Sequence, residues 1–285
     1  MHKIAIIGYG KLGSHLFHSL KRNRRIKVTT VVRNSKSIIN PALINLSDII
    51  FICTQDSKIR NAAKSLSAKP FDLKKKYIFH TSGSLNSDEL VNLKNKGVHT
   101  GSFHPVQTFE SRAGKYSHRF KNIYIAIEGS KESVKAGFRI SKLLDAMPFV
   151  ISKEDKIYHH ICCVIASNFL AAHLHQIDKL SRKRILKNGF NNLSFFSIYK
   201  PLVEQALENI ARKGAVKSLS GPVERNDLNT INKHLKALSK KHRDILPLYS
   251  LMGIETVKLA LKKKSLTQNE AKKFLTLLNK YLKNQ

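Results

Sequence analysis

The sequence predicts an α/β fold in which a doubly wound parallel sheet (residues 1–152) is followed by an all-helical domain (residues 153–285). Three observations support this prediction. Short β-branched apolar runs alternate with helix-period segments in units of about 25 residues, as in parallel sheets. A glycine-rich turn joins the first run to the first helix. After residue 152 only the helical period continues. The length of 285 residues is consistent with two domains.

The predicted strands are short, and each is followed by a turn or a helix. The first is the buried run KIAII at 3–7, after which Gly8–Gly13 opens a helix. The other strands are expected at 26–32, 49–54, 77–81, 98–103, 123–128 and 149–152. The helices of this half are expected at 14–22, 57–66, 87–96 and 131–146, with a short irregular or helical piece at 37–46.

The second half of the chain shows only the helical period. A long helix is predicted over about 154–180, and Ser152–Asp155 before it resembles a capping box with Asp in place of Glu. Thr267 and Glu270 form a regular capping box for the last helix. The helices that follow the long one are expected at 193–213 (interrupted at Pro201), 227–241, 244–263 and 268–283.

The composition excludes several classes of protein. Hydrophobic residues make up 42% and charged residues 25%, as in globular proteins, so disorder of the whole chain is not expected. The 3 Cys contain no CxxC pair, which excludes a disulfide scaffold and a cysteine-based zinc site as main themes, and we expect no metal. No apolar run reaches about 18 residues and the first residues do not resemble a signal peptide, so we expect a cytoplasmic protein without membrane contact.

The net charge of +32 is unusual. Basic surface attracts phosphate, so nucleic acid is one explanation, and a generally lysine-rich composition is the other. From Lys233 to Gln285 the basic residues alternate with apolar ones at helical spacing, as on solvated helix faces, and no basic tail or zinc finger accompanies them. We therefore do not expect nucleic acid as the main partner. The field would still attract small anionic cofactors and substrates.

The turn GYGKLG contains the pattern G-x-G-x-x-G between a strand and a helix, the context that makes this motif specific. Gly8 permits the tight turn, Gly10 permits close approach of a pyrophosphate, and Gly13 lets the helix pack on the strand. The helix N-terminus then faces the anion. These features predict a dinucleotide-binding Rossmann unit, with cofactor contacts from Gly8, Tyr9, Gly10, Lys11, Leu12 and Gly13.

The end of the second strand distinguishes between the two nicotinamide cofactors. An NAD site usually carries Asp or Glu at this point to bind the ribose 2′-hydroxyl. This chain has Arg33, Ser35 and Lys36 and no carboxylate, a set suited to a 2′-phosphate. We therefore expect NADP(H) as the cofactor.

Polar residues follow the third and fourth predicted strands. Because the carboxyl ends of parallel strands line the cofactor crevice, Thr54 and Gln55 are expected beside the cofactor. The turn at 80–84 places Ser82 and Gly83 where they could lie near the nicotinamide and a substrate carboxylate, although a plain turn fits the local sequence equally well.

The segment FHPVQTF carries a His and a Gln on a proline-containing loop between aromatic residues. His104 is a candidate proton donor because the unperturbed pKa of imidazole is near 6.5. Gln107 is a candidate substrate contact. The alternative for His104 is a histidine that simply packs within the loop.

Polar residues also interrupt the apolar helix predicted over 154–180. Such groups need hydrogen-bond partners if they are buried, so they would face the ligand crevice or a dimer partner. We expect Asn168 to be functional, and His159 or His160 to be the next candidates for the proton donor. Cys162 and Cys163 are expected in the core.

A loop in the helical half, SGPVERND, carries Arg225 and Asp227. Asp227 can cap the following helix. Arg225 either clamps a substrate carboxylate or bonds loop carbonyls.

Together, GYGKLG, the 80–84 turn, GSFHPVQTF, SNFLAA and SGPVERND resemble a family of Rossmann-like NADP oxidoreductases with a C-terminal helical domain of unknown function. That family is distantly related to ketopantoate, pyrroline-carboxylate and hydroxyisobutyrate reductases. The resemblance covers essentially the whole chain and implies NADP binding and a homodimer formed through the helical half. Two positions depart from the family pattern: Asn226, where Gly is usual, and Gln55, where Pro is frequent.

The resemblance implies an NADPH-dependent reductase of a small 2-oxo acid, with ketopantoate as the leading substrate. Two alternatives stay open. The same scaffold could reduce an imine or transfer hydride between NADP and a deazaflavin. It could also sense a nucleotide or bind nucleic acid without catalysis, because one fold hosts many functions.

Overall fold

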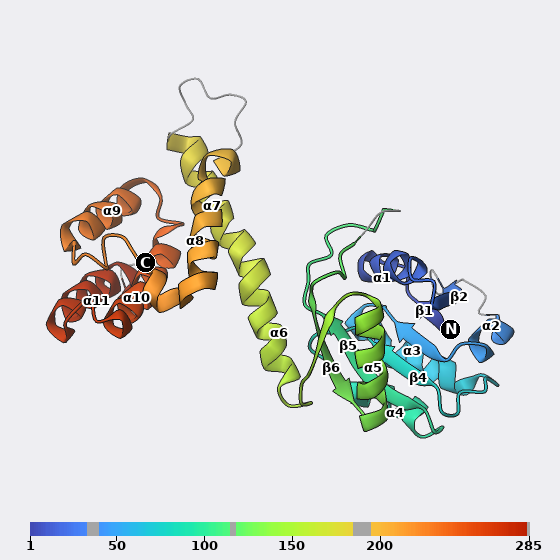
Figure 1. The fold of residues 1–285 in the computed structure, drawn as a ribbon. Coiled ribbons are helices and arrows are strands. Elements are labelled where there is room, and N and C mark those ends of the chain that lie inside the picture. The colour runs from blue at the N-terminus through green and yellow to red at the C-terminus, as the bar shows by residue number, and fades with distance from the viewer. Residues whose placement is uncertain (33–39, 115–117, 185–194, 284–285) are drawn as a thin grey trace. The chain divides into compact units, whose positions relative to one another are not determined.

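The computed structural model describes residues 1–32, 40–114, 118–184 and 195–283. The chain forms two compact units, Met1–Phe169 and Leu170–Gln285. Figure 1 shows the sheet in the first unit and the helices of the second. The alternation of strands and helices ends near residue 152, as predicted, but the first helix after that point belongs by its contacts to the sheet unit.

A seven-stranded sheet forms the centre of the first unit, with the order β2-β1-β3-β4-β5-β6-β7. The predicted α/β class is confirmed. Its strands are β1 His2–Ile7, β2 Ile26–Val32, β3 Ile49–Ile52, β4 Tyr77–His80, β5 His99–Pro105, β6 Tyr124–Gly129 and β7 Met147–Val150.

The sheet is not wholly parallel as the sequence predicted, because β6 pairs antiparallel with β5 and then parallel with β7. A parallel pair needs a long crossover connection, usually a helix. The described part of the connection between β5 and β6 contains no helix. The chain therefore returns in the opposite direction at this point.

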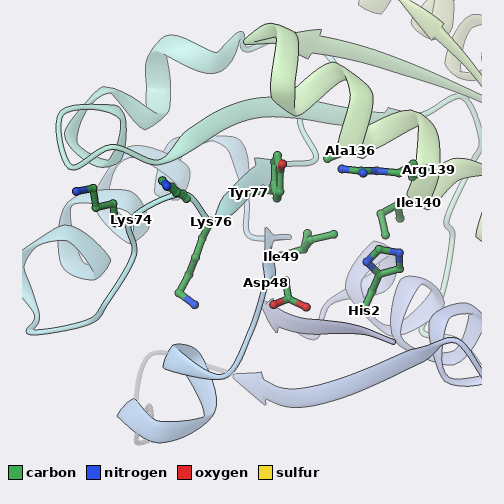
Figure 2. Close-up of a pocket in the computed structure, with 10 residues that line it drawn as sticks. His2, Asp48, Ile49, Lys74, Lys76, Tyr77, Ala136, Arg139 and Ile140 are labelled. Carbon is green, nitrogen blue, oxygen red and sulfur yellow. The ribbon is translucent and has the colours of Figure 1, made fainter.

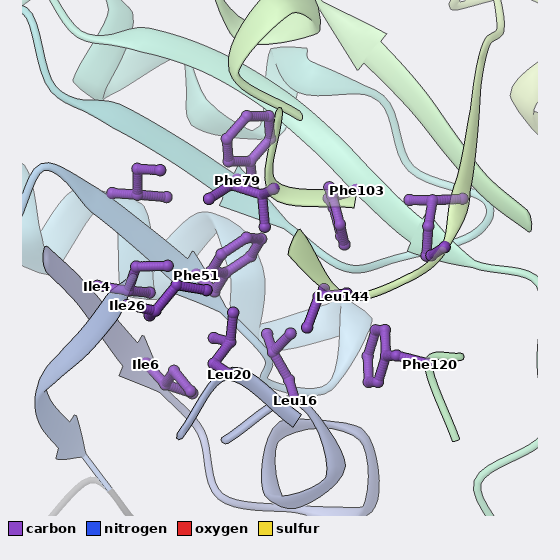
Figure 3. Packing of buried hydrophobic residues seen from close by; sticks show 14 of the residues in the cluster. Ile4, Ile6, Leu16, Leu20, Ile26, Phe51, Phe79, Phe103, Phe120 and Leu144 are labelled. Atoms are coloured by element: carbon purple, nitrogen blue, oxygen red, sulfur yellow. The ribbon is translucent and has the colours of Figure 1, made fainter. Parts of the chain in front are cut away.

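Helices cover both faces of the sheet, and alternation along the strands sends side chains to each. Along β1, Ile4 and Ile6 pack with Leu16 and Leu20 of α1 in one apolar cluster (Figure 3). The other face packs mainly on α3 and α4. The helices are α1 Lys11–Lys21, α2 Pro41–Asn45, α3 Asp56–Ala68, η1 Ser87–Leu90 (a 3-10 turn), α4 Val91–Lys94 and α5 Lys131–Leu143.

The strand order places a topological switch point between β1 and β3. The chain moves from β1 outward to β2, and then returns to the other side of β1 to continue with β3, β4 and β5. In open α/β sheets, ligands bind in the crevice outside the carboxyl ends of the strands at this point. The crevice lies directly after Ile7 and Ile52, the last residues of β1 and β3.

The long helix predicted over 154–180 is continuous but not uniform. It consists of α6 Lys156–Val164, the π-helical segment η2 Ile165–Phe169, and α7 Leu170–Arg184. Among the described residues, the stretch Lys156–Ser181 has the length and composition of a membrane-spanning helix, with a mean hydropathy of 1.3 in its most apolar window. Its first residue, however, is a buried lysine bonded to the sheet unit. The most apolar window of this helix, by contrast, contains no buried residue within the described chain.

The regular elements in the described part of the second unit are all helices, as predicted. Ile231, Leu235, Phe274 and Leu278 belong to its buried core. Asp227 caps α9 by accepting a hydrogen bond from Thr230 N at 3.0 Å, as predicted. The helices after α7 are α8 Phe195–Ser218, with a kink at Gly214, α9 Leu228–Lys241, α10 Leu246–Lys263 and α11 Gln268–Lys283.

Candidate active site

The glycine-rich turn between β1 and α1 is shaped by steric limits within the protein. Gly8 has φ +102°, and a Cβ on it would lie 2.6 Å from the carbonyl oxygen of Cys53. A Cβ on Gly13 would lie 2.0 Å from the carbonyl oxygen of Gly8. At Gly10, by contrast, nothing lies within 4 Å of the added atom. Gly8 and Gly13 are therefore required by the fold, whereas Gly10 leaves open space where a ligand can approach.

A cavity of about 1070 Å³ opens beside this turn, between the ends of β1 and β3 and the start of α3. Lys11, Lys58, Lys69 and Arg112 line it, and no carboxylate is among its described lining residues. Its volume and positive charge suit a large anionic ligand. The lining also includes Gly8, Tyr9, Gly10, Leu12, Thr54 and Gln55, which the sequence predicted as cofactor contacts.

Two unsatisfied features in this cavity indicate a polar ligand. Gly10 caps α1 without a side-chain hydrogen bond, so the first N–H groups of the helix remain for an anion. Thr54 Oγ1 is buried and has no hydrogen-bond partner within the described part of the chain. The predicted 2′-phosphate contacts Arg33, Ser35 and Lys36 lie outside the described residues.

A second polar cluster lies towards β4 and β5, and Lys156 is at its centre. The side chain of this residue is fully buried. Its Nζ donates hydrogen bonds to the carbonyl oxygen of Ser82 at 3.1 Å and to Ser102 Oγ at 2.8 Å. Burial lowers the pKa of Lys156 to about 8, although Glu128 and Asp56 act in the opposite direction. At pH 7 Lys156 is therefore an ammonium group that releases its proton more readily than an ordinary lysine.

The turn after β4 is held in place by hydrogen bonds. His80 Nδ1 accepts from Ser82 N, and Nε2 on the other side of the ring donates to the carbonyl oxygen of Asn86 at 2.9 Å. This pattern fixes a neutral tautomer, in agreement with burial, which lowers the pKa of His80 to about 4. Ser82 Oγ and Ser84 Oγ both donate to Asp56. The Ser82 carbonyl oxygen, which accepts the hydrogen bond from Lys156 Nζ, is therefore held in a fixed position.

Three imidazoles gather beside this turn. His104 Nδ1 lies 3.1 Å from His159 Nε2, and a Cβ on Gly83 would lie 2.8 Å from both His104 Nε2 and His160 Nδ1. Burial, and then Lys156 and the neighbouring histidines, lower the pKa of His104 to about 3. His104 is therefore neutral at pH 7. His160 Nδ1 is buried and has no hydrogen-bond partner among the described residues.

Two of the remaining predicted residues lie outside this cluster, and the third belongs to the other unit. Gln107 is exposed and turns back to accept a hydrogen bond from Thr108 N. Asn168 is exposed in the π-helical segment and accepts from Ser167 Oγ. Arg225 is exposed and belongs to the second unit. Their predicted roles stay predictions.

Sequence reasoning missed Lys156, because it is one of 51 Lys and Arg residues and stands in a polar segment that resembles a helix start. Its burial depends on contacts with β4 and β5, which no local pattern reports. One signal was present: Lys156 and His160 are four residues apart and so share one face of the helix. Lys156 was therefore as strong a candidate for the site as His160.

Another cavity, of about 390 Å³, lies at the opposite end of the strands, where they begin. Figure 2 shows Lys74, Lys76 and Arg139 around it, together with His2 and Asp48. It adjoins the starts of β1, β3 and β4. Ligands of open α/β sheets bind at the carboxyl ends of the strands, so this cavity is not the candidate cofactor site.

Comparisons with known proteins agree with this architecture. Residues 123–256 match a family model described as a domain of unknown function (DUF2520). The chain is similar to the structure of a "putative NADP oxidoreductase" from Bacteroides fragilis, with 22% identity, a TM-score of 0.68, and coverage of 91% of this chain and 98% of the other. Protein TM1727 from Thermotoga maritima gives 20% identity and a TM-score of 0.68, with coverage of 92% and 99%.

A more distant similarity is to pyrroline carboxylate reductase from Plasmodium falciparum with NADP bound, at 13% identity and a TM-score of 0.56, covering 97% of this chain and 98% of that one. No curated protein matches the chain in sequence. The structural neighbours confirm the resemblance inferred from the sequence motifs. At these identities what they establish is the fold: a Rossmann-like unit followed by a helical unit.

Proposed function

We propose that this protein is an NADPH-dependent reductase of a small 2-oxo acid, with ketopantoate (2-dehydropantoate) as the leading substrate. The observation that carries the proposal is the buried Lys156 ammonium, which bonds the turn after β4 in the same unit as the glycine-rich turn. Reduction of a carbonyl needs a hydride and a proton, and this unit offers a place for a source of each. The choice of ketopantoate rests on the family resemblance.

The residues of the first cavity fit NADP. Gly8, Gly10 and the start of α1 would hold the pyrophosphate, and Thr54 Oγ1 would gain the partner that it lacks within the described chain. Arg33, Ser35 and Lys36 are proposed for the 2′-phosphate. The bound nicotinamide supplies the hydride that goes to the carbonyl carbon of the substrate.

Lys156 is the proposed proton donor. With a pKa of about 8 it is protonated at pH 7, and two of its three N–H donors bond Ser82 and Ser102. The third N–H is proposed for the oxygen of a bound substrate, which would have to displace the groups that bury Lys156. The C=O bond becomes C–O–H as Nζ gives up its proton. The sequence suggested His104 as the donor. With a pKa of about 3, however, its ring is neutral at pH 7 and lacks the extra imidazolium proton that a histidine donates as a general acid. We assign His104, with Ser82 and Gly83, to positioning the substrate, and Asn168, Gln107 and Arg225 remain candidates for the same role.

Reduction of an imine is the second candidate function. Pyrroline carboxylate reductase, one of the structural neighbours, has a cyclic imine in its name. A protonated lysine would serve an imine nitrogen as well as a ketone oxygen. Substrate comparison separates the two.

The proposed assembly is a homodimer in the cytoplasm, as the family resemblance implies. Several large apolar side chains of α8 are exposed in the single chain, among them Leu202 at 68% and Leu207 at 50%. A second copy of the chain could cover them. Light scattering after size-exclusion chromatography tests this: a dimer that Leu202→Glu converts to a monomer supports the assembly, and a wild-type monomer rejects it.

The experiment is NADPH oxidation by the purified protein with ketopantoate, compared with oxaloacetate, 2-oxoisovalerate and pyrroline carboxylate. Turnover selective for ketopantoate supports the leading proposal. Turnover selective for pyrroline carboxylate would instead support the second candidate function, reduction of an imine. Binding of NADPH without any turnover would reject both and favour a nucleotide-sensing protein, and salt-sensitive binding of DNA or RNA would favour a nucleic-acid partner.

A further inference from the structure

Three metal-ligating atoms converge where α6 meets β5. His104 Nδ1 lies 3.1 Å from His159 Nε2, Cys163 Sγ lies 3.8 Å from the same nitrogen, and all three atoms lie within 4.8 Å of one another. His159 and Cys163 are four residues apart and so share one face of α6. His104 comes from a strand 55 residues away in the sequence.

Hydrogen bonding within this cluster cannot satisfy all three groups. A ring nitrogen carries either one N–H or one lone pair, directed in the plane of the ring. His159 Nε2 is approached by both His104 and Cys163, so it can serve only one of them well. A cation placed between the three atoms would accept a lone pair from each.

We propose that His104, His159 and Cys163 form a binding site for a divalent transition metal of the zinc class, with one coordination position left for water or another ligand. Two imidazoles and one thiolate are a typical donor set for zinc. Zinc bonds of about 2.0–2.3 Å in a tetrahedron put neighbouring ligand atoms about 3.3–3.6 Å apart. Two of the separations here, 3.1 and 3.8 Å, are close to that value, and the third pair, within 4.8 Å, would close as the side chains turn toward the cation.

The surroundings of the site are compatible with a bound cation. The three ligands are partly buried, which limits competition from water. Burial raises the pKa of the Cys163 thiol, so the bound cation itself would have to displace its proton to solvent and hold the thiolate. The small size of Gly83 keeps room beside the far nitrogen of His104. This site was not expected from the sequence, because the 3 Cys contain no CxxC pair and His104 is distant from the other two ligands in the chain.

The chain provides a matched control. Cys162 is adjacent to Cys163 but exposed, and it is not part of the converging group. Substituting each cysteine by serine therefore compares a proposed ligand with a neighbour of the same chemistry. The proposal does not depend on the reductase activity, because the probe is the metal alone.

The experiment is a titration of metal-free, untagged protein with Co²⁺, followed by absorption spectroscopy and by displacement with Zn²⁺. We expect one equivalent of Co²⁺ to produce a thiolate-to-cobalt charge-transfer band and tetrahedral d–d bands that Zn²⁺ removes. Cys162→Ser should retain these bands. Cys163→Ser should lose the charge-transfer band, and His159→Gln should weaken binding by about tenfold or more.

Two results would overturn the proposal: no thiolate band in the wild-type protein, or an equal band in Cys163→Ser. Circular dichroism of each variant establishes that it is folded. Because the cluster involves only side chains on elements whose backbone bonds are intact, we expect the variants to fold.

Discussion

The two ends of the candidate site are built in different ways. The cofactor cavity adjoins a contiguous turn, Gly8–Gly13, that follows a strand and starts a helix. The polar cluster is formed by side chains from separate elements: Ser82 after β4, His104 in β5, and Lys156 in α6. The first is visible in a sequence because its parts are neighbours in the chain. The second depends on burial and requires the folded structure.

The largest expected effect concerns Lys156. Replacement by Gln should lower turnover by about 10²–10⁴-fold, the usual contribution of a general acid, with little change in NADPH affinity. Lys153→Gln is the control, because Lys153 is a half-exposed lysine of the same segment and pairs with Asp88. Steady-state rates and NADPH fluorescence measure the two effects. If Lys156→Gln turned over substrate at the wild-type rate, Lys156 could not be the proton donor.

Two substitutions separate the structural role of the glycine turn from its proposed role in binding NADPH. Gly13→Ala places a methyl group 2.0 Å from the carbonyl oxygen of Gly8, so the free energy of unfolding should fall by about 1–3 kcal/mol. Gly10→Ala meets nothing within 4 Å, so its unfolding should stay within about 0.5 kcal/mol of wild type. Its NADPH affinity should nevertheless fall by about tenfold, because the methyl group occupies the space of the pyrophosphate.

Urea denaturation and NADPH titration measure these two quantities separately. If Gly10→Ala bound NADPH as well as the wild type, the dinucleotide could not approach the turn as proposed.

The smallest expected effect concerns the charges at the rim of the cofactor cavity. Arg112→Ala should raise the Kd for NADPH about two- to fivefold, and added salt should reduce this difference, because the contact is exposed and screened. Arg139 lies in the cavity at the opposite end of the strands (Figure 2). Arg139→Ala removes the same charge and should leave the Kd for NADPH unchanged. Equal effects of the two variants would mean that only the net charge of the protein attracts the cofactor.

Most of the fold could be predicted from the sequence. The run 26–32 became β2, and the last predicted helix, 268–283, has the same limits in the structure. The antiparallel strand β6 could not be predicted, because strand direction depends on the connection and a short apolar run carries no direction. Similarly, the sequence suggested His104 as an acid from its unperturbed pKa, whereas the structure lowers that pKa through burial and a neighbouring ammonium.

The pH dependence of turnover tests the central claim, that Lys156 supplies the proton, most directly. Lys156 is the acid below its pKa of about 8, so the rate of carbonyl reduction at saturating NADPH should be level near neutral pH and fall about tenfold per pH unit above about 8. Lys156→Gln should lack this descending limb. A rate that stayed level through pH 9, or one whose descending limb persisted in Lys156→Gln, would contradict the account.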